Sequence, residues 1–580
     1  MISILKKFNH LFDPVQRKKL VILFFLMLFG AFLEVLGVSL MLPLMSAIME
    51  TDIIETNEMV GQICGFLGIQ EHKSLVLICI GALIGVFVCK DIFLIFQYYV
   101  QARFVCNSRF KVQRRLLHAF IQRPYEYYLN AESGEIIRVM NTDIHQTFHL
   151  LTAILTFMTE SIISLALIIS VFIMEPKMML MIGASVGVTV IVIYKVVKPI
   201  LRREGLSFQQ NTARTNKWML QAISGIKEVK VAHKEEFFEK NYNESGEKVV
   251  RAEQWNSVLN QTPRLLIEMV CVCSTLTFMA LQIWMGQDIQ TMIPSFGAFV
   301  MAAVKLLPSA NRIVGAFNSI AYQEPSLNKT LENIEAVKSE EYLKTRAFED
   351  TKEGTLTAND KICLKDISFC YPESQTKVLD NATMVIPVGK SVGIVGSSGA
   401  GKTTAVDIML GLLKVQEGQI LADGKNVMEQ YPKWLSMIGY IPQSIFMLDD
   451  TIRANIAFGV SPEELNEDQV WHVLEEAQLA DFVRGLPDGL DTTIGERGVR
   501  LSGGQRQRIG IARALYPDPD LLIFDEATSA LDNETEAAIM ESINSLHGKK
   551  TMVIIAHRLQ TIENCDIVYR VQCGKIEREK

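Results

Sequence analysis

The sequence predicts a membrane domain of six transmembrane helices with long cytoplasmic extensions, followed by an α/β domain of the P-loop type. Six apolar runs long enough to cross a bilayer lie before residue 325, and a glycine-rich phosphate-binding motif lies at 396–404. Of the 580 residues, 49% are hydrophobic and 21% are charged. This mixture, with a mean hydropathy of +0.21, indicates a membrane part joined to a soluble part.

The apolar runs have approximate rather than sharp ends, because polar residues interrupt several of them. They lie near 20–48, 74–99, 147–174, 178–200, 265–285 and 294–320. Five basic residues precede the first run: Lys6, Lys7, Arg17, Lys18 and Lys19. That run is too long for a signal-peptide core and no cleavage site is obvious, so we expect a retained first transmembrane helix.

Charge sets the expected orientation and excludes some functions. Lys and Arg are concentrated in the two long segments 100–146 and 201–264, whereas the other connections carry few cations. The positive-inside rule then places both termini and both long segments in the cytoplasm.

A net charge of −7 gives no indication of nucleic-acid binding. The ten cysteines contain no C-x-x-C pair, so we expect neither a metal site nor a disulfide framework.

Both long cytoplasmic segments carry helical apolar periodicity that continues from the spans. A break is expected from Pro124 to Gly134 and another near Ser224-Gly225, and a short transverse helix at each break would be able to dock onto a soluble domain. The outer loop 50–73 mixes apolar residues with acids. It fits either a small amphipathic helix at the outer face or an ordinary loop with apolar anchors.

Three parts follow from composition. Residues 1–325 form the transmembrane domain, and the charged stretch 326–360 reads as a linker. From 361 to 580, short Val/Ile-rich runs alternate with helical stretches, which is typical of an α/β domain.

The P-loop follows a buried-strand pattern at 391–395 and precedes a helical one. Its residues are Gly396, Ser397, Ser398, Gly399, Ala400, Gly401, Lys402, Thr403 and Thr404. Glycines let successive backbone N–H groups converge on a phosphate, and the helix N-terminus adds positive potential. We expect Lys402 to reach the β- and γ-phosphates and the Thr403 hydroxyl to bind Mg²⁺.

A second nucleotide motif is the apolar run 521–524 that ends in Asp525 and Glu526. Asp525 is expected to hold Mg²⁺, and Glu526 to act as the general base on the attacking water. Between the two motifs lies the stretch Leu501-Ser502-Gly503-Gly504-Gln505. Its two glycines at a helix start present further N–H groups to an anion.

The stretch L-S-G-G-Q between a P-loop and a D-E strand is the signature of ATP-binding-cassette ATPases, and the region 361–580 resembles that cassette. The resemblance implies an active, ATP- and Mg²⁺-dependent ATPase whose further site residues are matched one by one. Tyr371 resembles the aromatic that stacks on adenine, and Gln443 the glutamine that senses Mg²⁺ and the membrane half. Asp532 lies in the loop that contacts the partner cassette, and His557 resembles the switch histidine on the γ-phosphate. Residues 495–498 resemble an exporter-specific loop.

In that family the signature of one cassette closes over the nucleotide on the P-loop of another. This chain has one of each, so the resemblance implies that Ser502, Gly503, Gly504 and Gln505 act on a second chain. A homodimer is the simplest reading. The membrane half resembles the type IV exporter half-transporters, which implies a multi-pass protein of the inner, cytoplasmic membrane.

A narrower resemblance is to the PglK-type flippases of bacterial protein N-glycosylation. It rests on 305–313 in the sixth span, on Pro263-Arg264 at the start of the fifth and on Glu34 in the first. It implies an undecaprenyl-pyrophosphate-linked oligosaccharide as cargo. Lys90 and Lys305 stand where those flippases carry arginine, which keeps the charge but not bidentate phosphate geometry.

Four cations border or interrupt apolar spans and are the candidate cargo ligands: Lys90, Arg264, Lys305 and Arg312. An ionisable residue inside a span is costly and suggests function by default. Lys305 and Arg312 are seven residues apart and share one helix face. The alternative for Arg264 and Arg312 is that they reach the cytoplasmic interface, and Arg264 is also spaced to pair with Glu268.

Two other functions stay open at this point. One is an exporter of another lipid, a peptide or a drug, although an apolar drug cavity would not need Lys90 and Lys305. The other is a membrane-tethered ATPase that regulates a partner channel. The complete catalytic set and six full spans argue against the second, and ATPase activity without cargo movement in sealed vesicles would favour it.

Overall fold

The computed structural model describes residues 2–40, 72–174, 176–285, 289–339, 356–372, 374, 376–495, 498–526, 540–541, 543–556 and 562–580. The chain divides into two compact units. The first comprises Met1–Arg123 and Ala131–Glu340, and the second Pro124–Asn130 and Glu341–Lys580. The predictions for 50–71, Glu496, Arg497, Asp532 and His557 lie outside the described residues.

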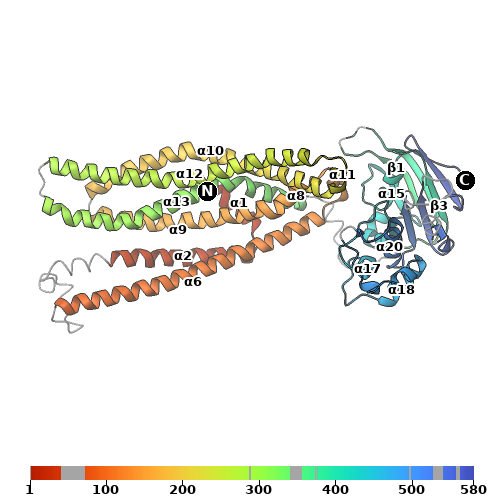
Figure 1. Cartoon of the computed structure of the whole chain (residues 1–580), viewed down its shortest axis with the longest axis horizontal. Coiled ribbons are helices and arrows are strands. Elements are labelled where there is room, and N and C mark those ends of the chain that lie inside the picture. The colour runs from red at the N-terminus through yellow and green to blue at the C-terminus, as the bar shows by residue number, and fades with distance from the viewer. Residues whose placement is uncertain are drawn as a thin grey trace. The chain divides into compact units, whose positions relative to one another are not determined.

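Long helices running side by side make up the first unit (Figure 1). They are α2 (Pro14–Ser39), α6 (His72–Ile121), α9 (Ile144–Met174), α10 (Pro176–Ser224), α12 (Glu235–Trp284) and α13 (Ile289–Ser339). α6, α10, α12 and α13 have 49 to 51 residues each, about 75 Å at 1.5 Å per residue. A bilayer core is about 30 Å thick, so the predicted extension beyond the membrane is confirmed. Within the described residues, five helices are long and apolar enough to span.

Close helix packing requires glycine at position 205 of the membrane half. α10 packs mainly on α12, α9 on α13 and α2 on α6. A Cβ at Gly205 of α10 would lie 2.2 Å from the backbone oxygen of Tyr322 in α13. Any larger residue at this position would therefore force the two backbones apart. The short helix α1 (Ile2–Leu11) precedes α2 and buries Ile4, Phe8 and Leu11.

Both predicted helix breaks are confirmed. α6 ends just before Pro124, and the chain continues through α7 (Tyr125–Asn130), α8 (Ser133–Arg138) and a π-helical turn at Val139–Asp143. α10 ends at Ser224, and α11 (Ile226–Val231) begins after Gly225. Proline disfavours helix in the residue before it and glycine weakens a helix, which explains both positions. The short helix α7 belongs to the second unit.

The segment expected as a linker, 326–360, starts as helix instead. α13 continues to Ser339 because Leu327, Leu331 and Ile334 repeat at helical spacing and are buried. The charged residues between them occupy the rest of the helix surface, so their abundance was a misleading sign of a linker at 326–339.

Two sheets form the second unit. The six-stranded sheet has the order β10 (Lys575–Arg578), β9 (Ile567–Gln572), β3 (Ser391–Val395), β8 (Thr551–Ile555), β7 (Leu521–Asp525) and β6 (Ile438–Ile441). All neighbours are parallel except β10 with β9. Every residue of β3, β7 and β8 is buried, as expected for a parallel sheet covered on both faces. The carboxyl ends of β3 and β7 therefore lie at the same edge.

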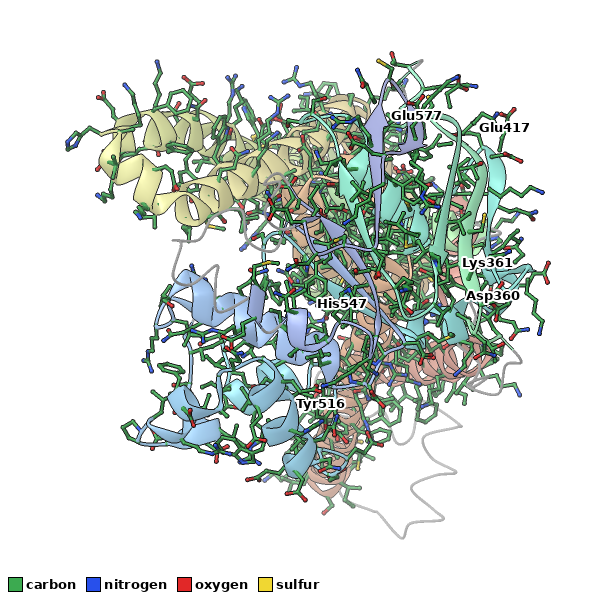
Figure 2. The ribbon with its side chains drawn as sticks, turned by 90° about the vertical axis from the view of Figure 1, so that its right-hand side faces the viewer. Asp360, Lys361, Glu417, Tyr516, His547 and Glu577 are labelled. Atoms are coloured by element: carbon green, nitrogen blue, oxygen red, sulfur yellow. The ribbon has the colours of Figure 1, made fainter. Side chains whose placement is uncertain are left out.

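The second sheet is antiparallel, in the order β2 (Leu379–Pro387), β1 (Lys361–Phe369), β4 (Glu417–Ala422) and β5 (Lys425–Asn426). Figure 2 shows Lys361 and Glu417 on this sheet, and Tyr516 among the helices of the other side. Those helices are α17 (Ile452–Ile456), α18 (Glu467–Glu476), α19 (Ala480–Arg484) and α20 (Gly503–Leu515). A further helix, α16 (Tyr431–Ser436), instead shares a hydrophobic core with β1, β2 and β4. The predicted fold class, a helical membrane region followed by an α/β nucleotide-binding domain, is confirmed.

Candidate functional site

The P-loop connects β3 to α15 (Lys402–Met409) through a backbone that glycine makes possible. Gly396, Gly399 and Gly401 have φ of +156°, +76° and +105°. A Cβ at Gly396 would lie 2.4 Å from the carbonyl oxygen of Val571 in β9. The loop is therefore pinned to the sheet at its start and turns left-handed into the helix, which exposes successive N–H groups to a phosphate.

Lys402 is buried inside this loop. Its Nζ donates to the backbone oxygens of Gly396 and Ser397, each at 3.0 Å. These two bonds replace water around a buried ammonium and hold it over the loop. The charge is thus positioned to exchange carbonyl partners for phosphate oxygens. Ser398, Gly399 and Ala400 form the rest of the loop between these partners and the helix.

Tyr371 lies beside the P-loop helix. Its hydroxyl is 3.0 Å from Thr404 Oγ1, and its ring packs edge-on against Phe369 at 5.1 Å between centroids. A cavity of about 490 Å³ next to it is lined by Glu126 of α7 and Lys414. Glu126 Oε1 accepts a hydrogen bond of 2.7 Å from the backbone N–H of Lys414. The predicted docking of a transverse helix on the soluble domain is confirmed for α7.

Asp525 ends β7 and is buried, with 4% of its surface exposed. Tyr440 donates to its Oδ2 at 3.4 Å, while its Oδ1 has no hydrogen-bond partner within the described residues. Burial and the neighbouring Glu526 raise the pKa of Asp525, whereas Tyr440, Thr403 and Lys402 oppose that rise. A buried carboxylate oxygen without a donor, beside the Thr403 hydroxyl, fits the oxygen ligands that Mg²⁺ prefers.

Glu526 follows Asp525 in a strained conformation, with φ of +51°. A non-glycine residue at positive φ is uncommon, and such strain concentrates at functional sites. Gln443 Nε2 donates to Glu526 Oε2 at 2.7 Å. The structure therefore brings together two residues that are 83 positions apart and that the sequence assigns to one catalytic step. The amide holds the carboxylate that is expected to act as base.

The stretch 501–505 starts α20 with reciprocal capping. Ser502 Oγ accepts from the Gln505 N–H at 3.2 Å, and Gln505 Oε1 accepts from the Ser502 N–H at 2.8 Å. This box fixes the first turn, which also carries the N–H groups of Gly503 and Gly504. The Ser502 hydroxyl proton is left to donate to an anion approaching the helix N-terminus.

Comparison with known proteins covers both halves of the chain. The family model described as the ABC transporter transmembrane region matches residues 5–303, and the one described as ABC transporter matches residues 379–529. The chain belongs to the ABC transporter family. This half-transporter is an ATPase that couples hydrolysis to transport across a membrane that it spans several times.

Individual relatives are similar over most of the half-transporter. It is 31% identical to the ATP-dependent lipid A-core flippase of Photorhabdus laumondii subsp. laumondii, over 80% of this chain and 79% of the relative. A flippase of the same name from Cupriavidus metallidurans is 30% identical, over 82% and 78% of the two chains. The solved structure of a bacterial Atm1-family ABC exporter with ATP bound has a TM-score of 0.75 at 21% identity, covering 98% and 96%. That likeness establishes the fold.

Sequence reasoning missed the residues that connect the signature helix of the half-transporter to the Gln443 segment. A Cβ at Gly510 of α20 would lie 2.1 Å from Ile445 Cδ1, so a larger residue there would require the Ile445 side chain to shift. Arg513, one turn later, donates to the Phe446 backbone oxygen at 2.7 Å and to the Asn455 backbone oxygen at 2.7 Å. The only sequence signal for this contact was the GxxR pattern of Gly510 and Arg513 in the helix after the signature. The pattern can be interpreted only when the position of the Gln443 segment is known.

Asp407 of α15 is a second, half-buried acid near the site. Burial and the nearby Asp525 raise the pKa of Asp407 to about 6. Burial and the charge of Asp525 also raise the pKa of Tyr440 above its usual range. The region behind the P-loop thus concentrates negative charge, and a divalent cation at Asp525 would relieve that repulsion.

The membrane half does not leave the candidate cargo ligands equally accessible. Lys90 was expected to face an open cavity, but its side chain is only 6% exposed. Its Nζ lies 3.1 Å from Asp91 and 4.4 Å from the centre of the Phe87 ring. The packing of α6 against α2 covers this lysine. Arg264 is exposed on α12, and the side chain of Lys305 lies outside the described residues.

Arg312 of α13 has a partner that the sequence did not suggest. Its Nε lies 2.5 Å from Oε1 of Glu160 in α9, and Glu160 is 9% exposed while Arg312 is 49% exposed. The other carboxylate oxygen of Glu160 has no hydrogen bond within the described residues. Glu160 interrupts an apolar run of α9, so its polarity was the available signal. Arg312 is thus anchored to a buried acid rather than reaching freely for the interface.

Proposed function

We propose that the chain works as a homodimeric, ATP-driven flippase in a bacterial inner membrane, with both termini in the cytoplasm. Its cargo would be a lipid-linked oligosaccharide of the undecaprenyl-pyrophosphate type, moved from the cytoplasmic to the outer leaflet. The observation that carries the lipid class is the similarity to glycolipid flippases over about 80% of the chain, through both halves. The basic side chains of the membrane half support an anionic headgroup.

The geometry of the cassette supports the following nucleotide step. The P-loop N–H groups at 396–404 and Lys402 bind the phosphates, Tyr371 stacks on adenine, and the partner's signature residues Ser502 to Gln505 close the site. Thr403, Gln443 and Asp525 would hold Mg²⁺, which neutralises charge on the phosphates when bound. Glu526 takes a proton from the attacking water, and its strained backbone keeps the carboxylate aimed. His557 would contact the γ-phosphate and Asp532 the partner cassette.

The bond between Gln443 and Glu526 suggests how transport controls this chemistry. While the Gln443 amide donates to Glu526, that donor occupies the carboxylate oxygen that would otherwise accept from the attacking water. Gln443 and Ile445 lie on a segment packed against α20 through Gly510. Movement of this segment would release Glu526 and shift the signature helix together, which links nucleotide closure to base activation.

Recognition of the cargo headgroup is proposed for Arg264, Lys305 and Arg312, with Lys90 exposed only in another conformation. Because Glu160 holds Arg312, a pyrophosphate must compete with that carboxylate. The exposed half of the guanidinium still offers N–H donors for such an exchange. Glu160 would then suppress binding of weak anions and favour multiply charged ones.

A second cargo is a glycolipid of the lipid A-core type. The relatives at 30% and 31% identity carry that name, whereas the resemblance to oligosaccharide flippases rests on short stretches. Both cargoes combine phosphate, sugar and lipid, so the residues named above serve either one. The two differ in the number of acyl or prenyl chains, which the polar contacts do not decide.

Reconstituted vesicles loaded with a panel of defined lipids separate these cargoes. When ATP is supplied, we expect the lipid-linked oligosaccharide to move from one leaflet to the other and an apolar dye to remain in its original leaflet. Movement of the lipid A-core glycolipid alone would select the second cargo. ATP hydrolysis at the normal rate with no movement of either lipid would contradict the flippase proposal and favour a regulatory ATPase.

A further inference from the structure

A cavity of about 400 Å³ lies between α6 and α9 in the membrane half. None of the described residues that line it is a candidate cargo ligand. Arg109 and Gln101 contribute from α6, and His145 and His149 from α9. The remaining lining is mainly apolar or aromatic, including Tyr98. Among the described residues that line the cavity, none is acidic. A groove with an apolar wall and basic residues at one end is the composition expected for a site that binds an anionic lipid headgroup together with its acyl chain.

The basic residues form a directed hydrogen-bond chain. Arg109 Nη1 lies 2.8 Å from His145 Nδ1, and His145 Nε2 lies 3.1 Å from His149 Nε2. A guanidinium only donates, so His145 Nδ1 must accept and its proton must sit on Nε2. That proton is donated to His149, whose own proton is then on Nδ1. The chain therefore ends in an N–H donor on an exposed imidazole, with further donors on Arg109.

The depth of the cavity points to the membrane boundary. Its residues run from 98 to 109 and from 145 to 152, and the predicted spans end at 99 and begin at 147. Tyr98 and Tyr99 are both exposed at this level, as aromatic residues are at headgroup depth. Basic pockets between transmembrane helices on the cytoplasmic side are suited to anionic headgroups.

We propose that this cavity binds the phosphate of an anionic membrane phospholipid, through Arg109 and His149. The site is separate from the proposed cargo ligands, since none of Lys90, Arg264 or Arg312 lines it. It would hold a bound lipid across α6 and α9 during transport, independent of which glycolipid is carried. Inorganic phosphate shares the chemistry of the headgroup but lacks a chain for the apolar wall.

The test measures lipid retention on the full-length dimer. The purified protein is placed in nanodiscs of phosphatidylcholine with or without phosphatidylglycerol. Native mass spectrometry then counts the lipid molecules that remain bound to the protein after it is released from the nanodisc. Arg109→Ala should lower retained phosphatidylglycerol by about tenfold, and His149→Ala by a smaller factor. Arg109→Lys should keep most of it, because the charge remains. Arg103→Ala is the matched control, an exposed arginine of α6 outside the cavity.

The outcomes are distinct. Loss in Arg109→Ala but not in Arg103→Ala, at equal amounts of folded dimer, supports the site. Equal loss in both variants would show only general attraction of the basic surface and would overturn it. Unchanged retention in Arg109→Ala would overturn it as well. Displacement of phosphatidylglycerol by millimolar inorganic phosphate would assign the cavity to a soluble anion and contradict the lipid.

Discussion

In the cassette, Lys402 is held by two backbone oxygens of its own loop, whereas in the membrane half Arg312 is held by Glu160 of another helix. The first arrangement is local, since a strand, a glycine loop and a helix within 19 residues build it. The second depends on which face of α13 meets which face of α9. Local backbone geometry thus fixes the position of Lys402, while long-range packing fixes the environment of the membrane cations.

The largest expected effect is in the cassette. Glu526→Gln should lower ATP hydrolysis by about 10²- to 10⁴-fold, because glutamine keeps the shape but cannot accept a proton. ATP binding should be retained, and a closed dimer with two nucleotides should accumulate. Hydrolysis assays with nucleotide-binding measurements check this, and a variant that hydrolyses ATP at the parent rate would exclude Glu526 as the base.

Lys402→Ala separates nucleotide binding from hydrolysis. The substitution removes the cation poised over the P-loop, so nucleotide affinity itself should fall by about tenfold or more. Equal affinity in variant and parent would count against the phosphate contact.

The composite site is tested with mixed dimers. Lys402→Ala in one chain and a Ser502 lesion in the other strike the same site and leave the second one intact, whereas both lesions in one chain damage both sites. The first arrangement should keep clearly more ATPase activity. Indistinguishable rates would remove the case for sites shared between two chains.

A smaller effect is expected where α20 meets the Gln443 segment. Gly510→Ala places a methyl group 2.1 Å from Ile445 Cδ1, and such overpacking costs about 1–3 kcal/mol. ATPase activity should fall severalfold through displacement of Gln443. Ile445→Val removes the clashing carbon, so the double variant should recover activity. Failure of that rescue would show that Gly510 acts in another way.

The smallest effect concerns pH. The pKa of Asp407 is about 6, above its ordinary value of 3.8, so the native state binds the proton more tightly. The stability from this group is present below pH 4 and is lost as pH rises through 6. Asp407→Asn should therefore raise the stability of the cassette at pH 7.5 by about 1–2 kcal/mol after allowance for solvent screening, with no gain at pH 4. Melting curves of nucleotide-free protein at both pH values check this, and an equal gain at both would contradict it.

Much of the fold was predictable because its signals are local. Span lengths, the breaks at Pro124 and Gly225 and the strand before Gly396 all follow from short stretches. The capping of Ser502 by Gln505 did not need the partner chain either. The burial of Lys90 and the Glu160 partner of Arg312 were not predictable, since both require the helix packing. The role of Gly510 was not predictable either, because the lack of room for a side chain at this position is seen only from the position of Ile445.

One measurement tests most directly whether anionic cargo recognition is separate from the ATPase. Parent, Arg312→Ala and Lys305→Ala proteins are reconstituted in sealed vesicles, and flipped lipid-linked oligosaccharide and hydrolysed ATP are counted per folded dimer in the same sample. Both variants should flip about tenfold less lipid while basal hydrolysis stays close to that of the parent, and Lys305→Arg should keep most activity. Variants that flip as much lipid per folded dimer as the parent would contradict the account.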